Sequence, residues 1–417
     1  MKRSPLLILF ITVVIDLLGF GIIMPLLPLY VNRFGGDEVA AGWLTTGFSV
    51  MQFAFAPIWG RVSDMRGRRP LILLSLAGSA LAFFLFGVAQ HLWVLFVARI
   101  AAGILTAASL PTAQAYIADV TPPERRARGM ALIGVAFGVG FACGPMLGGW
   151  LGGRYGLSVP AFVVAGMAAA NFVWSWFALP ESLAVRGAQA SPRPVVFFDW
   201  RAFQRAYRSP LLGELFTVFA FSTFAFAMME STFTWVILRR FVEPQLAHGV
   251  AASVIERTAA DHASRVFVIV GVSAVLAQGA VMGGLAQRFG DARLIRWGSM
   301  LLAIALWGIG ATHSFDTLKV LAAALAVGSG MANPALSSLV SRAADASERG
   351  SVLGVQQGLG ALARMIAPIT GTWLLEHASI GAAYTAAAVL MAVAYLCSLA
   401  VRDIPRATEM EATVVAH

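Results

Sequence analysis

Long apolar segments, each long enough to cross a lipid bilayer, follow one another along almost the whole chain. A membrane-spanning helix needs about 20 mostly apolar residues, and a backbone inside the hydrocarbon core must satisfy its own hydrogen bonds, which favours helices. The sequence therefore predicts an all-α integral membrane protein. The twelve predicted spans are residues 5–30, 42–60, 71–90, 92–117, 128–152, 158–179, 211–238, 265–286, 294–312, 317–340, 350–374 and 381–401.

The composition excludes a water-soluble fold. Hydrophobic residues make up 59% of the 417 residues and charged residues only 12%. That charged fraction is about half of the ~25% usual in soluble proteins. So much apolar surface requires lipid as the main solvent, which makes the bilayer the first predicted partner.

An internal repeat divides the spans into two groups of six. Shifting the sequence by 223 residues places Gly60 on Gly283 and Pro145 on Pro368, with further matches of glycine, proline and tryptophan from Gly67 to Trp150. Six is an even number, so the two halves have the same orientation in the membrane, as in transporters that rock around a central site. We expect an N-terminal half at 1–180, a linker at 181–210, a C-terminal half at 211–401 and a tail at 402–417.

The charge pattern predicts topology and not a nucleic-acid partner. The chain carries 30 basic and 21 acidic residues, and the basic residues lie in short clusters between the apolar segments. Most clusters fall on the side that holds both termini and the linker, and the positive-inside rule makes that side cytoplasmic. Short polar loops and the preference for arginine over lysine indicate a bacterial cytoplasmic (inner) membrane.

The sequence shows no chemistry typical of an enzyme. It has no phosphate-binding loop and no paired metal-ligand motif, and both cysteines lie in apolar segments. We therefore expect no enzymatic activity, no cofactor and no metal site. The second long loop, 239–264, is expected to carry at most a short surface helix.

The loop after the second span carries a specific motif. Its sequence from Gly60 to Pro70 resembles the signature of the major facilitator superfamily between spans two and three. The resemblance implies two parallel six-helix halves and a latch that holds them together on the cytoplasmic side. The alternative is an arginine cluster that only sets topology. The implied latch residues are Gly60, Asp64, Gly67, Arg68, Arg69 and Asp119.

The fifth span is rich in glycine and is similar to the antiporter motif of the drug:proton antiporters in that superfamily. Glycines remove side chains from one helix face, so that another helix can approach closely. The resemblance implies packing at the interface between the halves. The motif residues are Gly134, Gly138, Gly144, Pro145 and Gly148.

Four charged residues lie deep inside predicted spans, well away from the span ends, where charge is costly and marks function. Asp16 begins a segment that looks like the first span of tetracycline exporters. Arg99 matches a family motif whose arginine takes part in proton transfer, and Asp16 is its first expected partner, with a purely structural pair as the alternative. Glu230 is a candidate proton carrier, with pairing to Arg364 as the alternative.

The resemblance implies a proton-coupled antiporter that exports lipophilic or cationic drugs by alternating access, with protons and a small molecule as partners and a monomeric state. The alternative is a proton-coupled transporter of a metabolite such as a sugar, amino acid or lipid precursor. The third span lacks the acid that tetracycline exporters carry, so recognition of metal-bound tetracycline is not implied. Candidate cavity residues are Gln52, Tyr116, Phe137, Phe141, Phe226, Met229, Phe233, Trp235, Asn333 and Gln357.

Overall fold

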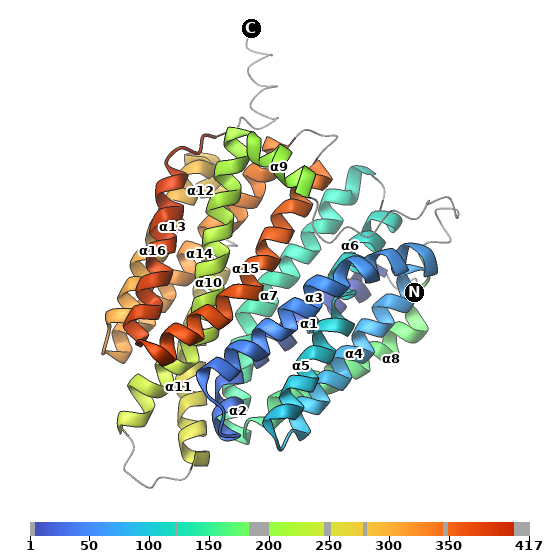
Figure 1. The fold of residues 1–417 in the computed structure, drawn as a ribbon. Coiled ribbons are helices and arrows are strands. Elements are labelled where there is room, and N and C mark those ends of the chain that lie inside the picture. The colour runs from blue at the N-terminus through green and yellow to red at the C-terminus, as the bar shows by residue number, and fades with distance from the viewer. Residues whose placement is uncertain are drawn as a thin grey trace.

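A computed structural model describes residues 5–121, 123–182, 200–245, 252–277, 282–344 and 349–403. Helices dominate these ranges, and they form two groups joined by the linker (Figure 1). The N-terminal half contains α1 (Pro5–Ile23), α2 (Leu27–Arg33), α3 (Glu38–Arg66), α4 (Arg68–Val88), α5 (Leu92–Thr106), α6 (Ser109–Val120), α7 (Pro123–Tyr155) and α8 (Ser158–Ala178).

The C-terminal half follows the short linker helix α9 (Trp200–Arg208). It contains α10 (Pro210–Ile237), a π-helical turn (Leu238–Val242), a 3-10 turn (Glu243–Gln245), α11 (Ala252–Leu276), α12 (Met282–Phe289), α13 (Asp291–Ala311), α14 (Phe315–Ala343), α15 (Arg349–His377) and α16 (Ile380–Ser398).

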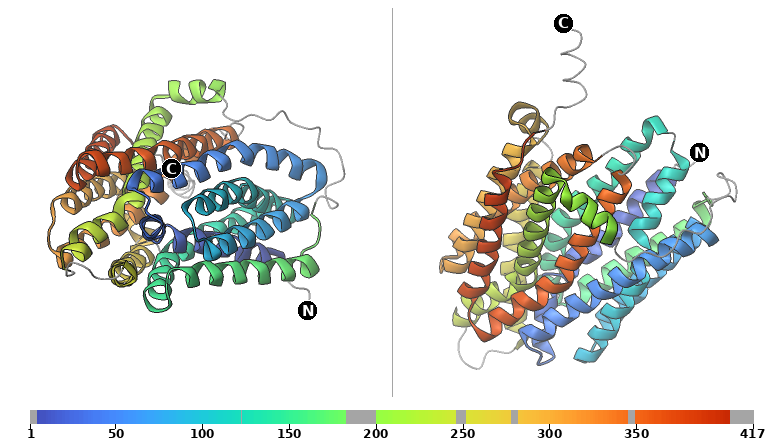
Figure 2. Two further views of the ribbon diagram at one scale, coloured as in Figure 1. Left: turned by 60° about the horizontal axis from the view of Figure 1, so that its bottom comes forward. Right: turned by 45° about the horizontal axis from the view of Figure 1, so that its top comes forward.

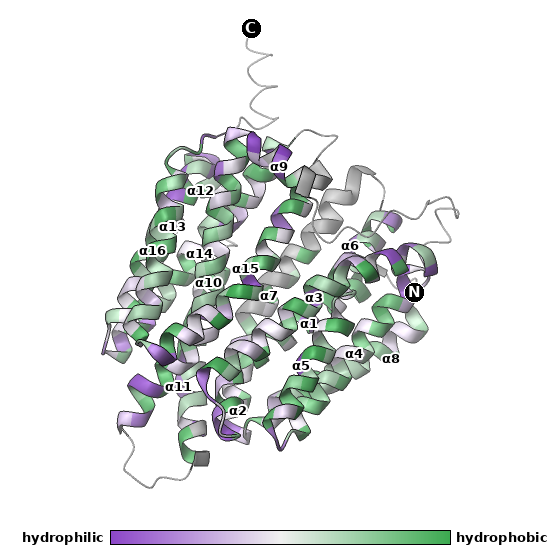
Figure 3. Ribbon diagram, in the orientation of Figure 1, coloured by the Kyte–Doolittle hydropathy of each residue, from purple (hydrophilic) through white to green (hydrophobic). Residues whose placement is uncertain are grey.

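The predicted membrane fold is confirmed. Among the described residues, 11 segments are long and apolar enough to cross a membrane. The 33-residue helix α7 stands between the fourth and the sixth predicted span and completes the set of twelve. Apolar residues predominate along the helices (Figure 3). Large apolar side chains such as Trp93, Phe177 and Trp307 are exposed on the bundle, as expected for a surface that faces lipid.

Two spans are broken near prolines. The first span ends as α1 at Ile23 and resumes as α2 at Leu27, and Pro25 and Pro28 lie at this corner. The fourth span is interrupted between α5 and α6, where Pro111 cannot donate a hydrogen bond to the carbonyl four residues earlier. These breaks bend helices that the apolar pattern alone presents as continuous.

The long loop predicted at 239–264 is shorter than expected. Helix α11 already begins at Ala252, so the polar segment from 252 to 264 belongs to the eighth span and not to a separate surface helix. The segment 246–251 lies outside the described residues.

The two halves converge at one end of the molecule and separate toward the other (Figures 1 and 2). The termini lie toward the end where the halves separate, which we call the termini end. The opposite end, which holds α2 and the beginning of α11, is the far end. Helices α3 and α15 pack together across the halves, and so do α7 and α11.

Candidate functional site

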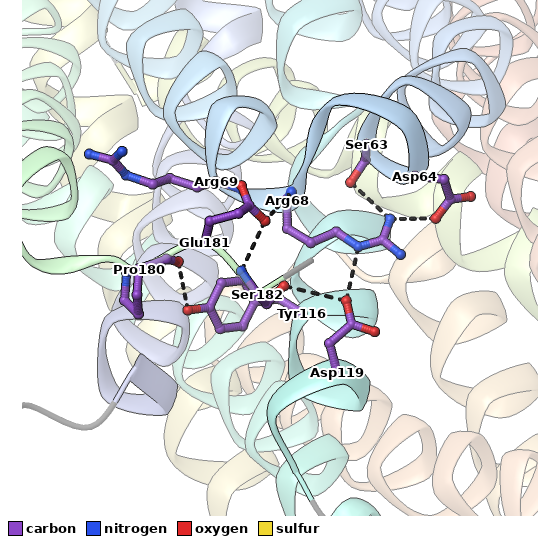
Figure 4. A network of polar contacts seen from close by, with 9 residues as sticks. All are labelled: Ser63, Asp64, Arg68, Arg69, Tyr116, Asp119, Pro180, Glu181 and Ser182. Carbon is purple, nitrogen blue, oxygen red and sulfur yellow. Dashed lines mark hydrogen bonds and ion pairs between the residues drawn. The ribbon is translucent and has the colours of Figure 1, made fainter. Parts of the chain in front are cut away.

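A polar network occupies the termini end of the N-terminal half, and Arg68 at the start of α4 is its centre (Figure 4). One guanidinium nitrogen lies 2.6 Å from Asp64 Oδ1 and donates to Ser63 Oγ at 3.0 Å. Arg68 Nε donates to Asp119 Oδ2 at the end of α6, at 3.2 Å. The side chains of Arg68 and Asp119 are only 8% and 1% exposed, so this ion pair is shielded from solvent. The predicted latch residues therefore join α3, α4 and α6 within one half.

The linker begins by capping α4. Glu181 accepts hydrogen bonds from the backbone N–H groups of Arg68 and Arg69, at 2.9 and 3.1 Å (Figure 4). A carboxylate at a helix N-terminus satisfies free N–H groups and complements the helix dipole. Gly67 has a φ of +102°, and a Cβ there would lie 2.7 Å from Glu181 Cδ. Glycine is therefore required for both the turn and the cap, whereas Gly60 has no atom within 4 Å of such a Cβ.

The C-terminal half repeats this arrangement with its charges reversed. The 223-residue shift carries Arg68 to Asp291 and Asp119 to Arg342, and these two side chains form an ion pair between α13 and α14. Asp403 replaces Glu181 as the cap, because its carboxylate accepts from the N–H of Ala292 at 2.8 Å. The repeat thus preserves the geometry of the network while its two charges exchange places.

Among the residues that the structure describes, two polar contacts join the halves at the far end. Glu38, the first residue of α3, forms an ion pair with Arg239 in the π-helical turn after α10, and its side chain is only 5% exposed. The N–H of Val39 donates to Glu376 Oε2 near the end of α15, at 3.2 Å. Arg240 donates to the carbonyl oxygens of Gly310 and Thr312 and so attaches the turn that carries Arg239 to α13.

Helix α7 packs on two partners through different glycines. A Cβ on Gly144 would lie 2.9 Å from Gly21 Cα, and one on Gly148 would lie 2.6 Å from the carbonyl oxygen of Ile22, so these motif glycines face α1 of the same half. The contact between halves uses Gly149, whose Cβ would lie 2.7 Å from Ser264 Cα of α11. The two neighbouring faces of α7 therefore serve different interfaces. For Gly134 and Gly138 the structure gives only their place in α7.

Asp16 is not paired with Arg99, contrary to the expectation from sequence. Its carboxylate accepts hydrogen bonds from Ser109 of α6 and from Ser79 of α4, the latter at 2.9 Å. A hydroxyl can donate to a carboxylate and accept from a carboxylic acid, so both protonation states of Asp16 find partners.

Arg99 is buried among apolar groups near the far end. Its guanidinium lies 5.0 Å from the ring centroid of Phe48 and 5.9 Å from that of Phe86, and it contacts Met24 Sδ at 3.1 Å. The acid with which it interacts electrostatically is Glu230 of α10, which lies in the other half.

Glu230 interacts electrostatically with arginines of both halves. One is Arg364 in the middle of α15, and the other is Arg99 in α5. A single carboxyl group is thus held in the field of two cations, one on each side of the interface. A change in its charge alters the attraction between the halves.

The candidate cavity residues differ in their exposure. Tyr116 is buried and donates to the carbonyl oxygen of Pro180, 2.9 Å away, so it packs within its own half. Met229, Phe233 and Trp235 are also buried in the core. Gln52 and Phe226 are half-buried, and Asn333 and Gln357 are exposed. The side chains of Phe137 and Phe141 lie outside the described residues.

Sequence reasoning missed the Asp291–Arg342 pair of the C-terminal half and the contacts that join the halves at the far end. The Asp291–Arg342 pair could have been predicted from the sequence, because the 223-residue shift carries Arg68 to Asp291 and Asp119 to Arg342. Nothing in the sequence joins Glu38 to Arg239, since the two residues belong to different halves and to different positions in the repeat.

Known proteins are similar over nearly the whole chain. Residues 9–255 and 246–413 match the family model of the Major Facilitator Superfamily. The class G tetracycline resistance protein of Vibrio anguillarum is 30% identical over 418 residues, covering 98% of this chain and 99% of the relative. The class C protein of Escherichia coli is 30% identical over 382 residues, covering 89% of each.

Solved transporter structures share the fold. The human organic anion transporter MFSD10 (TETRAN) is 25% identical, with a TM-score of 0.67 over 95% of this chain and 99% of that one. The nucleoside transporter NupG is 13% identical, with a TM-score of 0.73 over the same shares of the two chains.

Proposed function

The chain belongs to the major facilitator superfamily of membrane transporters, and from that premise we propose that it exports lipophilic or cationic drug-like molecules in exchange for protons. The tetracycline resistance proteins, similar over most of the chain, support a drug-like substrate. Helix α4 carries no acidic residue, so the proposal does not extend to the metal complex of tetracycline.

The observation that supports proton coupling is the electrostatic interaction of Glu230 with Arg364 and Arg99. Because Arg99 belongs to one half and Arg364 to the other, a proton bound to Glu230 weakens an attraction that spans the interface. Movement of the halves then depends on whether the proton is bound, which is what an exchanger requires. Asp16 is the second candidate carrier, because its serine partners suit either protonation state.

The proposal includes an orientation. The predicted topology places both termini in the cytoplasm of a bacterium, with the protein acting as a monomer in the inner membrane. In that orientation the far end faces outward and is closed by the contacts of Glu38 and Val39. The arrangement of the halves then corresponds to an inward-facing state of the transport cycle.

Purified protein in liposomes that contain a pH-sensitive dye tests the proposal. Tetracycline and a panel of cationic drugs are added under an imposed pH gradient to the wild type, Glu230→Gln and Asp16→Asn. Glu214→Gln is the matched control, because it changes an acid near the other end of the same helix.

We expect drug-dependent proton flux in the wild type and the control, and its loss in at least one of the two test variants. Flux that persists in both variants would place the proton carrier elsewhere. A wild type that responds to no drug would contradict drug export and favour the metabolite alternative.

A further inference from the structure

The linker helix α9 has two chemically distinct faces. Arg205 and Arg208 share one side at helical spacing, whereas Phe203 and Tyr207 share another, and for Trp200 and Arg201 the structure gives only their place in the helix. A short helix with basic and aromatic faces is typical of a segment that lies in the membrane interface.

Contacts of the aromatic residues attach α9 to the C-terminal half. Phe203 packs against the buried core, and its ring centroid lies 5.3 Å from that of Tyr207. The Tyr207 hydroxyl shares a 2.8 Å hydrogen bond with Thr217 of α10. Helix α9 also contacts α15, so it rests on the two helices that carry Glu230 and Arg364.

The position of α9 relative to the bilayer follows from its neighbour. Helix α10 begins at Pro210, two residues after α9 ends, and is one of the membrane spans. Helix α9 lies across the helix ends at the periphery of the bundle (Figures 1 and 2). It is therefore at the depth of the lipid headgroups, and Arg205 and Arg208 are exposed there.

We propose that the arginine face of α9 binds the headgroups of anionic phospholipids. Basic residues next to a span attract anionic lipid, and a guanidinium matches the geometry of a phosphate. The aromatic face holds the helix on α10 and α15, so a bound lipid stabilises the C-terminal half. This inference is independent of the transported substrate and of proton coupling.

Lipid titration of the full-length, delipidated protein in detergent tests the proposal. Dioleoyl-phosphatidylglycerol and dioleoyl-phosphatidylcholine have the same acyl chains and differ in headgroup charge. Binding is measured by native mass spectrometry and by the shift in thermal unfolding temperature. The test variant replaces Arg201, Arg205 and Arg208 with glutamine. The control makes the same three changes at the far end, at Arg33, Arg257 and Arg265, which are also exposed.

We expect the wild type and the control to bind phosphatidylglycerol more tightly than phosphatidylcholine, and the preference to fall with salt. Each arginine removed from α9 weakens phosphatidylglycerol binding roughly fivefold. Equal binding of the two lipids by the wild type would overturn the proposal. An equal loss in the control, or an unchanged preference in the α9 variant, would also overturn it.

A Tyr207→Phe variant keeps the proposal testable if the arginine variant fails to fold. It retains all three arginines and removes only the hydrogen bond to Thr217. We expect its preference for phosphatidylglycerol to persist, with a smaller thermal shift on lipid binding because α9 is less firmly attached. Loss of the lipid preference in this variant would contradict an arginine site.

Discussion

The two ends of the molecule use their polar contacts differently. At the termini end, the described contacts of Arg68 and Asp119 stay within the N-terminal half, and those of Asp291 and Arg342 stay within the C-terminal half. At the far end, Glu38 pairs with Arg239 of the other half. One end therefore stabilises each half as a unit, whereas the other end holds the two units together.

This difference suits a transporter whose halves move as rigid bodies. A network inside one half survives when the halves rotate, because its members move together. A contact between halves must break when the far end opens, so its strength sets the balance between the two states. The following predictions separate these two roles, from the largest expected effect to the smallest.

Loss of the Arg68 side chain should destabilise the N-terminal half most. Arg68→Met removes the cation that faces the buried carboxylate of Asp119, and we expect a cost of about 3 kcal/mol in stability. The measurement is the thermal unfolding temperature of the purified protein. Arg61→Met is the control, because Arg61 is exposed near the same turn. Equal stability of the two variants would show that the network contributes nothing.

The reversed polarity of the C-terminal pair suggests a rescue of that variant. Arg68→Asp combined with Asp119→Arg copies the Asp291–Arg342 pair. We expect this double variant to be more stable than either single charge reversal.

Loss of the far-end ion pair should open the far end without destabilising either half. Glu38→Ala removes a contact worth about 2 kcal/mol, which corresponds to about a thirtyfold shift toward the far-end-open state. Spin labels at Trp43 and Val254, both exposed, report the distance between the halves in a variant without the native cysteines.

Charge reversal at both positions is the matched test. Glu38→Arg with Arg239→Glu should restore the closed distance, whereas Glu38→Arg alone should open it further. An unchanged distance in Glu38→Ala would mean that packing alone closes this end.

Substitution of Gly149 should separate α7 from α11. An alanine Cβ there would lie 2.7 Å from Ser264 Cα, and an overpacked contact costs about 1–3 kcal/mol. The same pair of labels should report a longer distance at the far end. Gly47→Ala is the control, because no atom lies within 4 Å of a Cβ at that position.

Gly144→Ala should lower the thermal stability instead, since Gly144 faces α1 within one half.

Substitution of Glu376 should have the smallest effect. Glu376→Ala removes one hydrogen bond to the backbone of Val39 and should cost about 1 kcal/mol. Glu376→Gln keeps an acceptor oxygen and should leave the label distance unchanged. A larger opening by glutamine than by alanine would show that the charge, and not the hydrogen bond, matters.

The sequence alone was sufficient for the fold and for one polar network. Apolar length determined the spans, and the 223-residue repeat determined the two halves. The motif from Gly60 to Pro70 indicated Arg68 and Asp64, and the family resemblance added Asp119 after the fourth span; the structure brings the three together. These features are local or repeated, so their spacing along the chain carries the information.

The tertiary structure alone decided which helices share a polar contact. Asp16 meets Ser79 and Ser109 and not Arg99, and Glu38 meets Arg239. Each of these contacts depends on the tilt and rotation of the helices involved. Packing between neighbouring helices sets the tilt and rotation of each helix. The length of an apolar segment in the sequence specifies neither of them.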